Sequence, residues 1–260
     1  MLFSDRVFVG IDPTAASRPM HYVALNADLE IITRDRGDLE HVLAFLAGLE
    51  RAVVAINAPS GPNLGLMRQE TLRRRYNLRS GRSTWVKWRV CEVDLRRRNI
   101  HLYNTPGSRD LAAGWVQQGF SLFARLQTLG YRIRLDDAQA PDRALLEVQP
   151  HAAFTALLER RPFPKHSLEG RLQRQLVLYL ERVEIPNPLQ CLEEVTRHHL
   201  LSGHLPLDDL HTAEELDALV AAFTAYCSVH EPGRITRVGE QDEGVITLPV
   251  ASLRDHYPSE

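Results

Sequence analysis

The sequence predicts an α/β fold in which helices flank a mixed β-sheet. Residues 7–11 and residues 52–56 are short apolar runs rich in β-branched side chains. Such runs are typical of central strands that are buried on both faces of a sheet. Between them, Asp38 has the character of a helix N-cap, and residues 42–49 repeat apolar side chains at helical spacing. We therefore expect a strand, a helix, and a second strand that runs parallel to the first.

The remaining elements complete this sheet and cover it. His21–Ala27 and Leu29–Thr33 are expected to pair as an antiparallel hairpin with a turn at residues 26–28. Residues 144–148, which end before Pro150, predict a fifth strand, and residues 245–248 predict a short final one. Helices are expected over residues 109–129, 151–160, 168–183, 188–202 and 212–229.

Residues 58–108 interrupt the pattern, and we expect them to form an arginine-rich helical insertion within one domain that spans residues 1–260. Between Arg68 and Arg98, eleven basic residues stand against three acidic ones. Such a segment can follow a phosphate backbone, and aromatic residues within it can stack on bases. Nucleic acid is therefore the expected partner. The alternative is a solvated helical insertion whose basic faces pack partly on the rest of the fold. The aromatic residues concerned are Tyr76, Trp85 and Trp88.

Composition limits the remaining possibilities. The chain has 260 residues, of which 44% are hydrophobic and 25% charged, so it can bury a full core. Its net charge of −2 gives no overall attraction to nucleic acid. No apolar run is long enough to cross a membrane, no signal-peptide pattern opens the sequence, and the three cysteines lie far apart. We therefore expect a cytoplasmic protein that does not bind membranes, and the oligomeric state stays open.

Three acidic residues stand where a metal-dependent site is expected. Asp12 follows the first strand, Glu147 lies near the end of the fifth, and Asp217 lies early in the helix that Thr212 caps. Small side chains on that helix should press Asp217 toward the sheet, although an acid there also favours the helix dipole. Carboxylates from separate elements can hold Mg²⁺ or Mn²⁺, and a pair of such ions can activate water against a phosphodiester.

Five segments in a fixed order resemble a known family. The chain is similar to the family catalogued as domain of unknown function 429, which is often described as predicted nucleases of ribonuclease-H-like fold. The resemblance implies a ribonuclease-H-like mixed five-stranded sheet and a metal-dependent nuclease site at the three acids. The segments are Val9–Asp12, Val54–Pro59, Glu147–Ala152, Asp217–Ala222 and Glu243–Pro249.

The chain departs from this family at Asn57, where an aspartate is usual and where we expect a neighbour of Asp12. An amide oxygen can ligate a metal but brings no negative charge. The site should then hold a single metal, gain another acid, or have lost activity. Glu92 is the candidate substitute, because Arg89, Glu92 and Arg96 resemble the family's arginine–acid–arginine block. The alternative is an intrahelical ion pair between Glu92 and Arg96.

Two more residues are expected at the substrate. His151 begins a helix close to Glu147 and is a candidate proton shuttle or phosphate ligand, the alternative being a local hydrogen-bonding residue. Lys165 stands where the family also tends to carry a lysine and can offer a point charge to phosphate, the alternative being a surface lysine.

The sequence therefore favours a metal-dependent nuclease that uses Mg²⁺ or Mn²⁺. One alternative is a nucleic-acid-binding protein that keeps the fold but has lost turnover, for which Asn57 is the main support. Another is a small-molecule phosphohydrolase or phosphotransferase, since related folds handle nucleotides and sugars.

Overall fold

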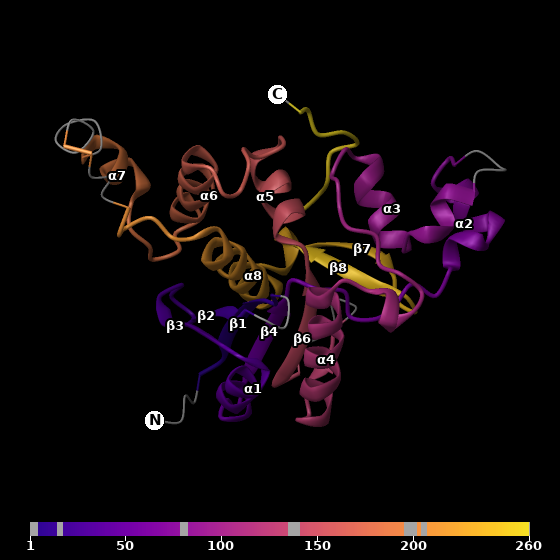
Figure 1. The fold of residues 1–260 in the computed structure, drawn as a ribbon, viewed down its shortest axis with the longest axis horizontal. Coiled ribbons are helices and arrows are strands. Elements are labelled where there is room, and N and C mark those ends of the chain that lie inside the picture. Colours follow the sequence, from indigo (N-terminus) through magenta and orange to yellow (C-terminus); the bar gives the residue numbers. More distant parts are fainter. Residues whose placement is uncertain are drawn as a thin grey trace.

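The computed structural model describes residues 5–14, 18–78, 83–134, 141–194, 202–203 and 207–259. Over these residues the core is one mixed sheet of eight strands in the order β3-β2-β1-β4-β6-β8-β7, with β5 beside β6 (Figure 1). Strands β1, β4, β6 and β8 run parallel, while β2, β3 and β7 are antiparallel to their neighbours. The strands are β1 (Val7–Asp12), β2 (Met20–Leu25), β3 (Ile31–Gly37), β4 (Ala52–Ile56), β5 (Arg132–Ile133), β6 (Arg143–Val148), β7 (Thr236–Glu240) and β8 (Gly244–Leu248).

The prediction of an α/β fold with a mixed sheet is confirmed, whereas the expected number of five strands is wrong. Strand β7 was missed because it is polar, contains Gly239, and lies at the edge of the sheet, where no apolar run is required. Strand β5 has only two residues, which is too short for any periodicity. The hairpin strands β2 and β3 are confirmed, and β3 extends to Gly37.

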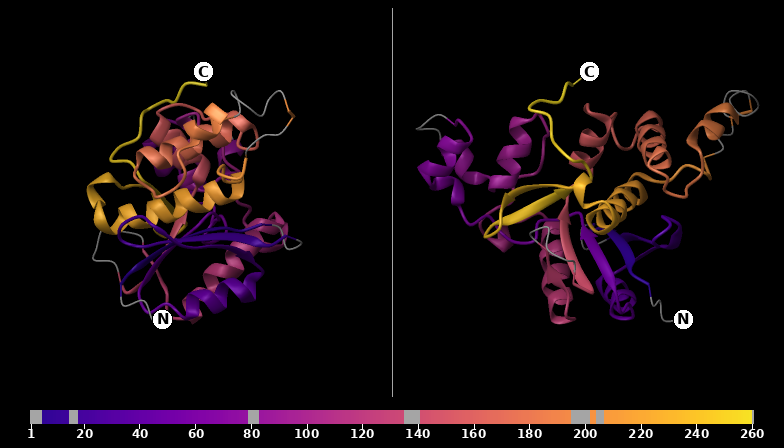
Figure 2. Two further views of the ribbon diagram at one scale, coloured as in Figure 1. Left: turned by 90° about the vertical axis from the view of Figure 1, so that its left-hand side faces the viewer. Right: turned by 180° about the vertical axis from the view of Figure 1, so that it is seen from behind.

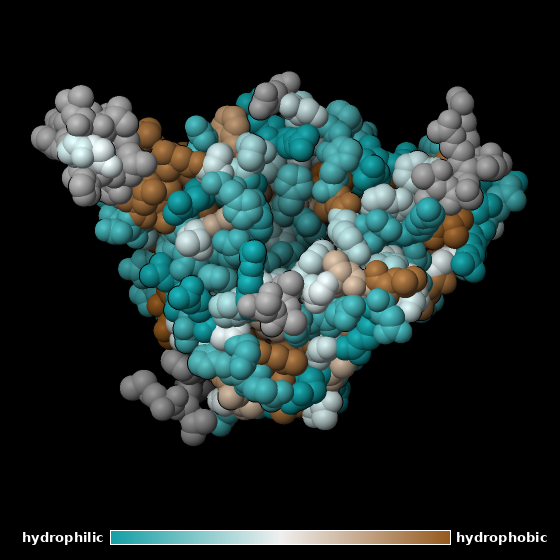
Figure 3. All heavy atoms as spheres, in the orientation of Figure 1, coloured by the Kyte–Doolittle hydropathy of each residue, from teal (hydrophilic) through white to brown (hydrophobic). Residues whose placement is uncertain are grey.

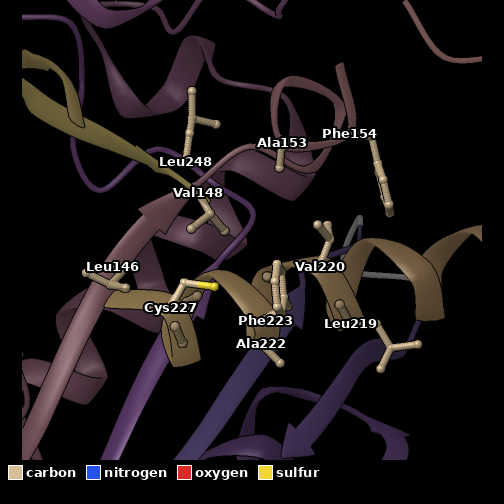
Figure 4. Packing of buried hydrophobic residues seen from close by; sticks show 14 of the residues in the cluster. Leu146, Val148, Ala153, Phe154, Leu219, Val220, Ala222, Phe223, Cys227 and Leu248 are labelled. Carbon is tan, nitrogen blue, oxygen red and sulfur yellow. The ribbon is translucent and has the colours of Figure 1, made fainter. Parts of the chain in front are cut away.

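Helices cover both faces of the sheet, as the two views of Figure 2 show. One layer is α1 (Leu39–Ala47) with α4 (Gly114–Thr128), and the other is α8 (Ala213–His230), over which α5 (Pro150–Leu158) and α6 (Leu168–Leu180) pack. The alternation of strand residues sorts the core: Val9 and Ile11 face α1 and α4, whereas Phe8 faces α8. Figure 4 shows the second layer, in which Val220 and Phe223 lie close to Val148 and Phe154.

The other predicted helices are present with shifted ends. Helix α7 (Pro188–Glu194) matches the first part of the helix expected over residues 188–202, and residues 195–201 lie outside the described residues. The capping box that begins α8 is confirmed, because Thr212 Oγ1 accepts from the Glu215 amide at 3.2 Å and Glu215 Oε2 accepts from the Thr212 amide at 2.8 Å. In the described part of the chain, no helix has both the length and the apolar content that a membrane crossing requires.

The arginine-rich segment is helical and forms a small core of its own. It comprises η1 (Leu66–Arg68), α2 (Glu70–Arg75), η2 (Ser83–Lys87) and α3 (Val90–Arg97), followed by η3 (Arg109–Leu111) before α4. The aromatic residues that were expected to stack on bases are partly buried and pack instead around Met67, Val90 and Val93. Arginines cover two of them, since Arg96 lies 4.6 Å from the ring centroid of Trp88 and Arg97 lies 5.9 Å from that of Tyr76.

Helix α8 approaches β1 so closely that position 10 has room for no side chain. A Cβ atom on Gly10 would lie 1.9 Å from the carbonyl oxygen of Ala218 and 2.4 Å from the amide nitrogen of Ala222. Both are backbone atoms of the helix, so neither can move aside without shifting α8 as a whole. Small residues on α8 permit the contact, which is why Asp217 is buried against the sheet, as its position in the small-residue stripe predicted.

We predict that Gly10→Ala lowers the free energy of unfolding by about 3 kcal/mol, because the new methyl group collides with the backbone of α8. Urea denaturation followed by circular dichroism measures this loss. Gly233→Ala is the matched control, since a Cβ there meets no atom within 4 Å. Equal stability of the two variants would contradict the close packing.

Candidate functional site

A pocket of about 1050 Å³ opens where the parallel strands β1, β4 and β6 end. This edge of an open α/β sheet is where ligands usually bind. Figure 3 shows the centre of this face as a hollow with mainly hydrophilic residues around it. Of the site residues that the sequence predicts, all but Arg96 line the pocket. They are Asp12, Asn57, Arg89, Glu92, Glu147, His151, Lys165 and Asp217.

Two of the predicted acids face each other across the contact between β1 and α8. The side chains of Asp12 and Asp217 are both buried, with residue exposures of 6% and 5%. Asn57, at the end of β4, donates from Nδ2 to Oδ1 of Asp12 at 2.6 Å, so the expected neighbours are confirmed. Lys165 donates from Nζ to Oδ2 of Asp217 at 2.8 Å. The loop between α5 and α6 therefore supplies a cation, the Lys165 ammonium, to this pair.

Burial makes the carboxylate pair electrostatically costly. It raises the pKa of Asp12 to about 7, and the neighbouring charge of Asp217 adds to that rise. Burial also raises the pKa of Asp217, against the opposing effect of the Lys165 ammonium. For Lys165, burial lowers the pKa, but Asp217 more than offsets it and the net shift is upward. The Lys165 ammonium contacts the pair, the positive charge of Arg174 also acts on Asp217, and Glu214 at the pocket wall adds a further negative charge.

The third predicted acid, Glu147, is held by Arg89. The Arg89 guanidinium donates to both oxygens of Glu147, at 2.5 Å and 3.1 Å, and Ser60 donates to Oε2 from its amide and its hydroxyl at 2.8 Å. In the strand register Glu147 lies beside Ile56, so its side chain leaves the sheet on the face opposite Asp12. Both partners are buried. Removing either one would leave an uncompensated buried charge and strongly destabilise the folded protein.

Glu92 belongs to the same buried network and does not replace the missing acid at position 57. It accepts from Arg89 Nε at 2.9 Å and from the Thr105 hydroxyl at 2.5 Å, so the expected pairing with Arg96 is wrong. Burial raises the pKa of Glu92, although Arg89 opposes that shift. Glu243 accepts from the amide of Val90, and together these acids cap the N-terminus of α3.

The position of Gly244 depends on this network. Its φ of +113° lies in a region that side chains rarely adopt, and a Cβ would lie 2.7 Å from Arg89 Nη1 and 3.0 Å from Glu147 Oε2. The backbone of the β7–β8 turn therefore closes directly over the ion pair. This explains why Glu243 and Gly244 stand together at that turn.

The structure does not bring together the three-acid centre predicted from the sequence. Among the described residues, no three His, Cys, Asp or Glu side chains are placed to hold a metal together. The prediction that Asp12, Glu147 and Asp217 share a metal is therefore corrected, because Arg89 and Ser60 occupy the oxygens of Glu147. Mg²⁺ is commonly held by one or two carboxylates, with water and substrate oxygens completing the shell. Asp12 and Asp217 meet that requirement.

Other polar residues of the pocket have distinct roles. Burial, together with the positive charge of Arg174, lowers the pKa of His151 to about 4, so the imidazole is neutral at pH 7. Arg174 itself was not predicted, because an arginine in the middle of α6 has no local pattern that sets it apart. It is 3% exposed, lines the pocket, and donates from Nη1 to the carbonyl oxygens of Phe163 and Gly170 at 2.9 Å.

Comparison of the sequence with known proteins identifies its family. The sequence matches the family described as Protein of unknown function (DUF429) over residues 10–243, which includes both members of the carboxylate pair. The chain belongs to the DUF429 family. No curated protein and no solved structure gave a significant match. Membership confirms the resemblance drawn from the five segments, and Asp12 and Asp217 lie in two of them.

We predict that Asp12→Asn stabilises the metal-free protein at high pH. The pKa of Asp12 is raised from 3.8 to about 7 on folding, so the stability that protonation provides is full below pH 4 and is lost as the pH rises through 7. The variant lacks this loss, and its advantage in unfolding free energy should grow to at most about 4 kcal/mol by pH 8.

Urea titrations in EDTA between pH 4 and pH 8 measure this difference, with the exposed Asp242→Asn as the control. If the free energy of unfolding falls with pH in Asp12→Asn as much as in the wild type, a group other than Asp12 causes the fall.

Proposed function

We propose that this protein is a metal-dependent nuclease of ribonuclease-H-like fold, with the Asp12–Asp217 pair as its reactive centre. The observation that carries the proposal is this pair of buried carboxylates at the wall of a pocket, whose pKa values stay raised although Lys165 and Arg174 act on them. Buried acids with raised pKa values in a cleft are typical of functional sites. The strand order β3-β2-β1-β4-β6 supports the ribonuclease-H-like core, to which β5, β7 and β8 are additions.

Asp12 and Asp217 would hold one Mg²⁺ or Mn²⁺, and the amide oxygen of Asn57 would reach it after a rotation of the side chain that now donates to Asp12. Such an ion lowers the pKa of water and stabilises negative charge on a phosphoryl oxygen. Lys165, released from Asp217, is then free to contact the phosphate. His151, neutral at pH 7, can donate a hydrogen bond to a phosphate oxygen, whereas its low pKa makes it a weak base.

Glu147, Glu92 and Arg89 have a supporting part in this proposal. Arg89 pairs with both glutamates at the pocket wall, so the three residues hold β6 and the start of α3 in place and their charges are compensated within the protein. Arg96 lies over Trp88 and does not line the pocket. We propose a cytoplasmic location as well, which is supported by Cys91 and Cys227, since both are buried and form no disulfide.

Asn57 favours a second candidate function, a nucleic-acid-binding protein that no longer turns over its ligand. Its amide group donates to Asp12 at 2.6 Å and contributes no charge where the family usually carries an aspartate. The variant Asn57→Asp separates the two functions. A gain of Mn²⁺-dependent cleavage from an inactive wild type supports the binding protein, whereas intact wild-type cleavage supports a working single-metal site.

We predict Mn²⁺-dependent cleavage of single-stranded DNA or RNA by the wild-type protein, and a loss of about 100-fold or more in Asp12→Asn and Asp217→Asn. Denaturing gels with end-labelled oligonucleotides measure the rates, with EDTA as the blank. Asp242→Asn, an exposed acid outside the pocket, should cleave at the wild-type rate. Cleavage that survives both EDTA and the Asp12→Asn substitution would refute the proposal.

A further inference from the structure

Three aromatic side chains line the pocket, and the proposed cleavage chemistry does not use them. Tyr103 and Phe163 both line the pocket, yet 41% and 45% of their surfaces remain exposed. Trp115, at the start of α4, also lines the pocket and meets Tyr103 edge to face, with ring centroids 5.5 Å apart. Large rings left exposed in a polar pocket are surfaces on which a ligand can stack.

Basic side chains line the same pocket. Arg174 is fixed through Nη1 to the Phe163 carbonyl oxygen, and its Nε is buried with no hydrogen-bond partner among the described residues. The loop that carries Phe163 also supplies Arg161 and Lys165 to the pocket, and Arg18 lines it from the segment after β1. Positive charge next to stacking surfaces is the pattern of a site for a nucleotide unit.

The aromatic residues of the arginine-rich segment do not offer this surface. They pack around Met67, Val90 and Val93, and Arg96 and Arg97 lie over the rings of two of them. Many arginines of the segment are also engaged in contacts within the protein, such as Arg74 with Glu70 and Arg75 with Glu240. We therefore expect base stacking in the pocket and not on the arginine-rich segment.

The volume of the pocket indicates whether single-stranded or double-stranded nucleic acid can enter it. A volume of about 1050 Å³ lies at the upper end of sites that enclose small molecules, so one or two nucleotides can enter. Bases inside a duplex are stacked on their neighbours and must be unpaired before a ring of the protein can cover them. An unpaired strand end meets that condition without cost.

We propose that the pocket binds the unpaired end of a nucleic-acid strand, with a base stacked on Tyr103 or Phe163 and its phosphate beside Arg174. This inference rests on the proposed nuclease function only for the direction of the scissile phosphate, toward Asp12 and Asp217. It assigns the aromatic residues to recognition and defines the substrate class as single-stranded. A free mononucleotide shares the same chemistry and is separated from a strand end by the experiment below.

The test is fluorescence anisotropy in EDTA with a labelled single-stranded 12-mer, as DNA and as RNA, and with the same sequence as a blunt duplex. We expect the wild-type protein to bind at least one single strand about 10-fold more tightly than the duplex, and Tyr103→Ala and Phe163→Ala to weaken that binding about 10-fold each. Tyr103→Phe keeps the ring and should bind within 2-fold of wild type. Tyr179→Ala is the matched control, because Tyr179 is 40% exposed on α6 and does not line the pocket.

Equal binding of the duplex and the single strands, or wild-type affinity in both alanine variants, overturns the inference. So does binding of adenosine monophosphate by a protein that binds neither oligonucleotide, which would identify a free nucleotide as the ligand. Because EDTA removes turnover, the outcome does not depend on catalysis. A protein that binds strand ends through Tyr103 but never cleaves them would refute the nuclease proposal and leave this inference standing.

Discussion

The close contact between α8 and β1 is the constraint on which the site depends. Gly10 leaves space for the backbone at Ala218 and Ala222, so the helix lies directly on the strand. Because the helix lies so close to the strand, the first turns of α8 lie at the end of β1, and Asp217 is buried near Asp12. Two carboxylates are thereby removed from water at a cost in folding free energy, which a bound cation would offset.

A second set of acids is separated from this pair by charge compensation. Arg89 binds Glu147 and Glu92 in a fully buried network that also joins the turn between β7 and β8. These acids are saturated with donors, so they stabilise the junction between the sheet and α3 and have little left to offer a ligand. The same pocket edge thus contains one group of acids that Arg89 neutralises and a second pair, Asp12 and Asp217, whose charge is less fully compensated.

The Asp12–Asp217 pair was largely predictable from local sequence. Parallel strands that end together place Asp12 next to Asn57, and the small residues and capping box of α8 predicted a buried Asp217. The pairing of Glu147 was not predictable, because Arg89 lies 58 residues away and the arginine–acid–arginine block that contains it gives no sign that it binds Glu147. Tyr103 and Phe163 lie in loops, where no periodicity marks a side chain as part of a site.

The central claim is that Asp12 and Asp217 together form a cation site. The most direct measurement is anomalous diffraction from crystals soaked in millimolar Mn²⁺, for the wild-type protein and for Asp12→Asn. The account predicts one peak between the two carboxylates, with Lys165 moved away from Asp217, and no peak in the variant. A peak that persists in Asp12→Asn would contradict this account. So would a wild-type structure in which Lys165 stays bound to Asp217 and no Mn²⁺ lies near the pair.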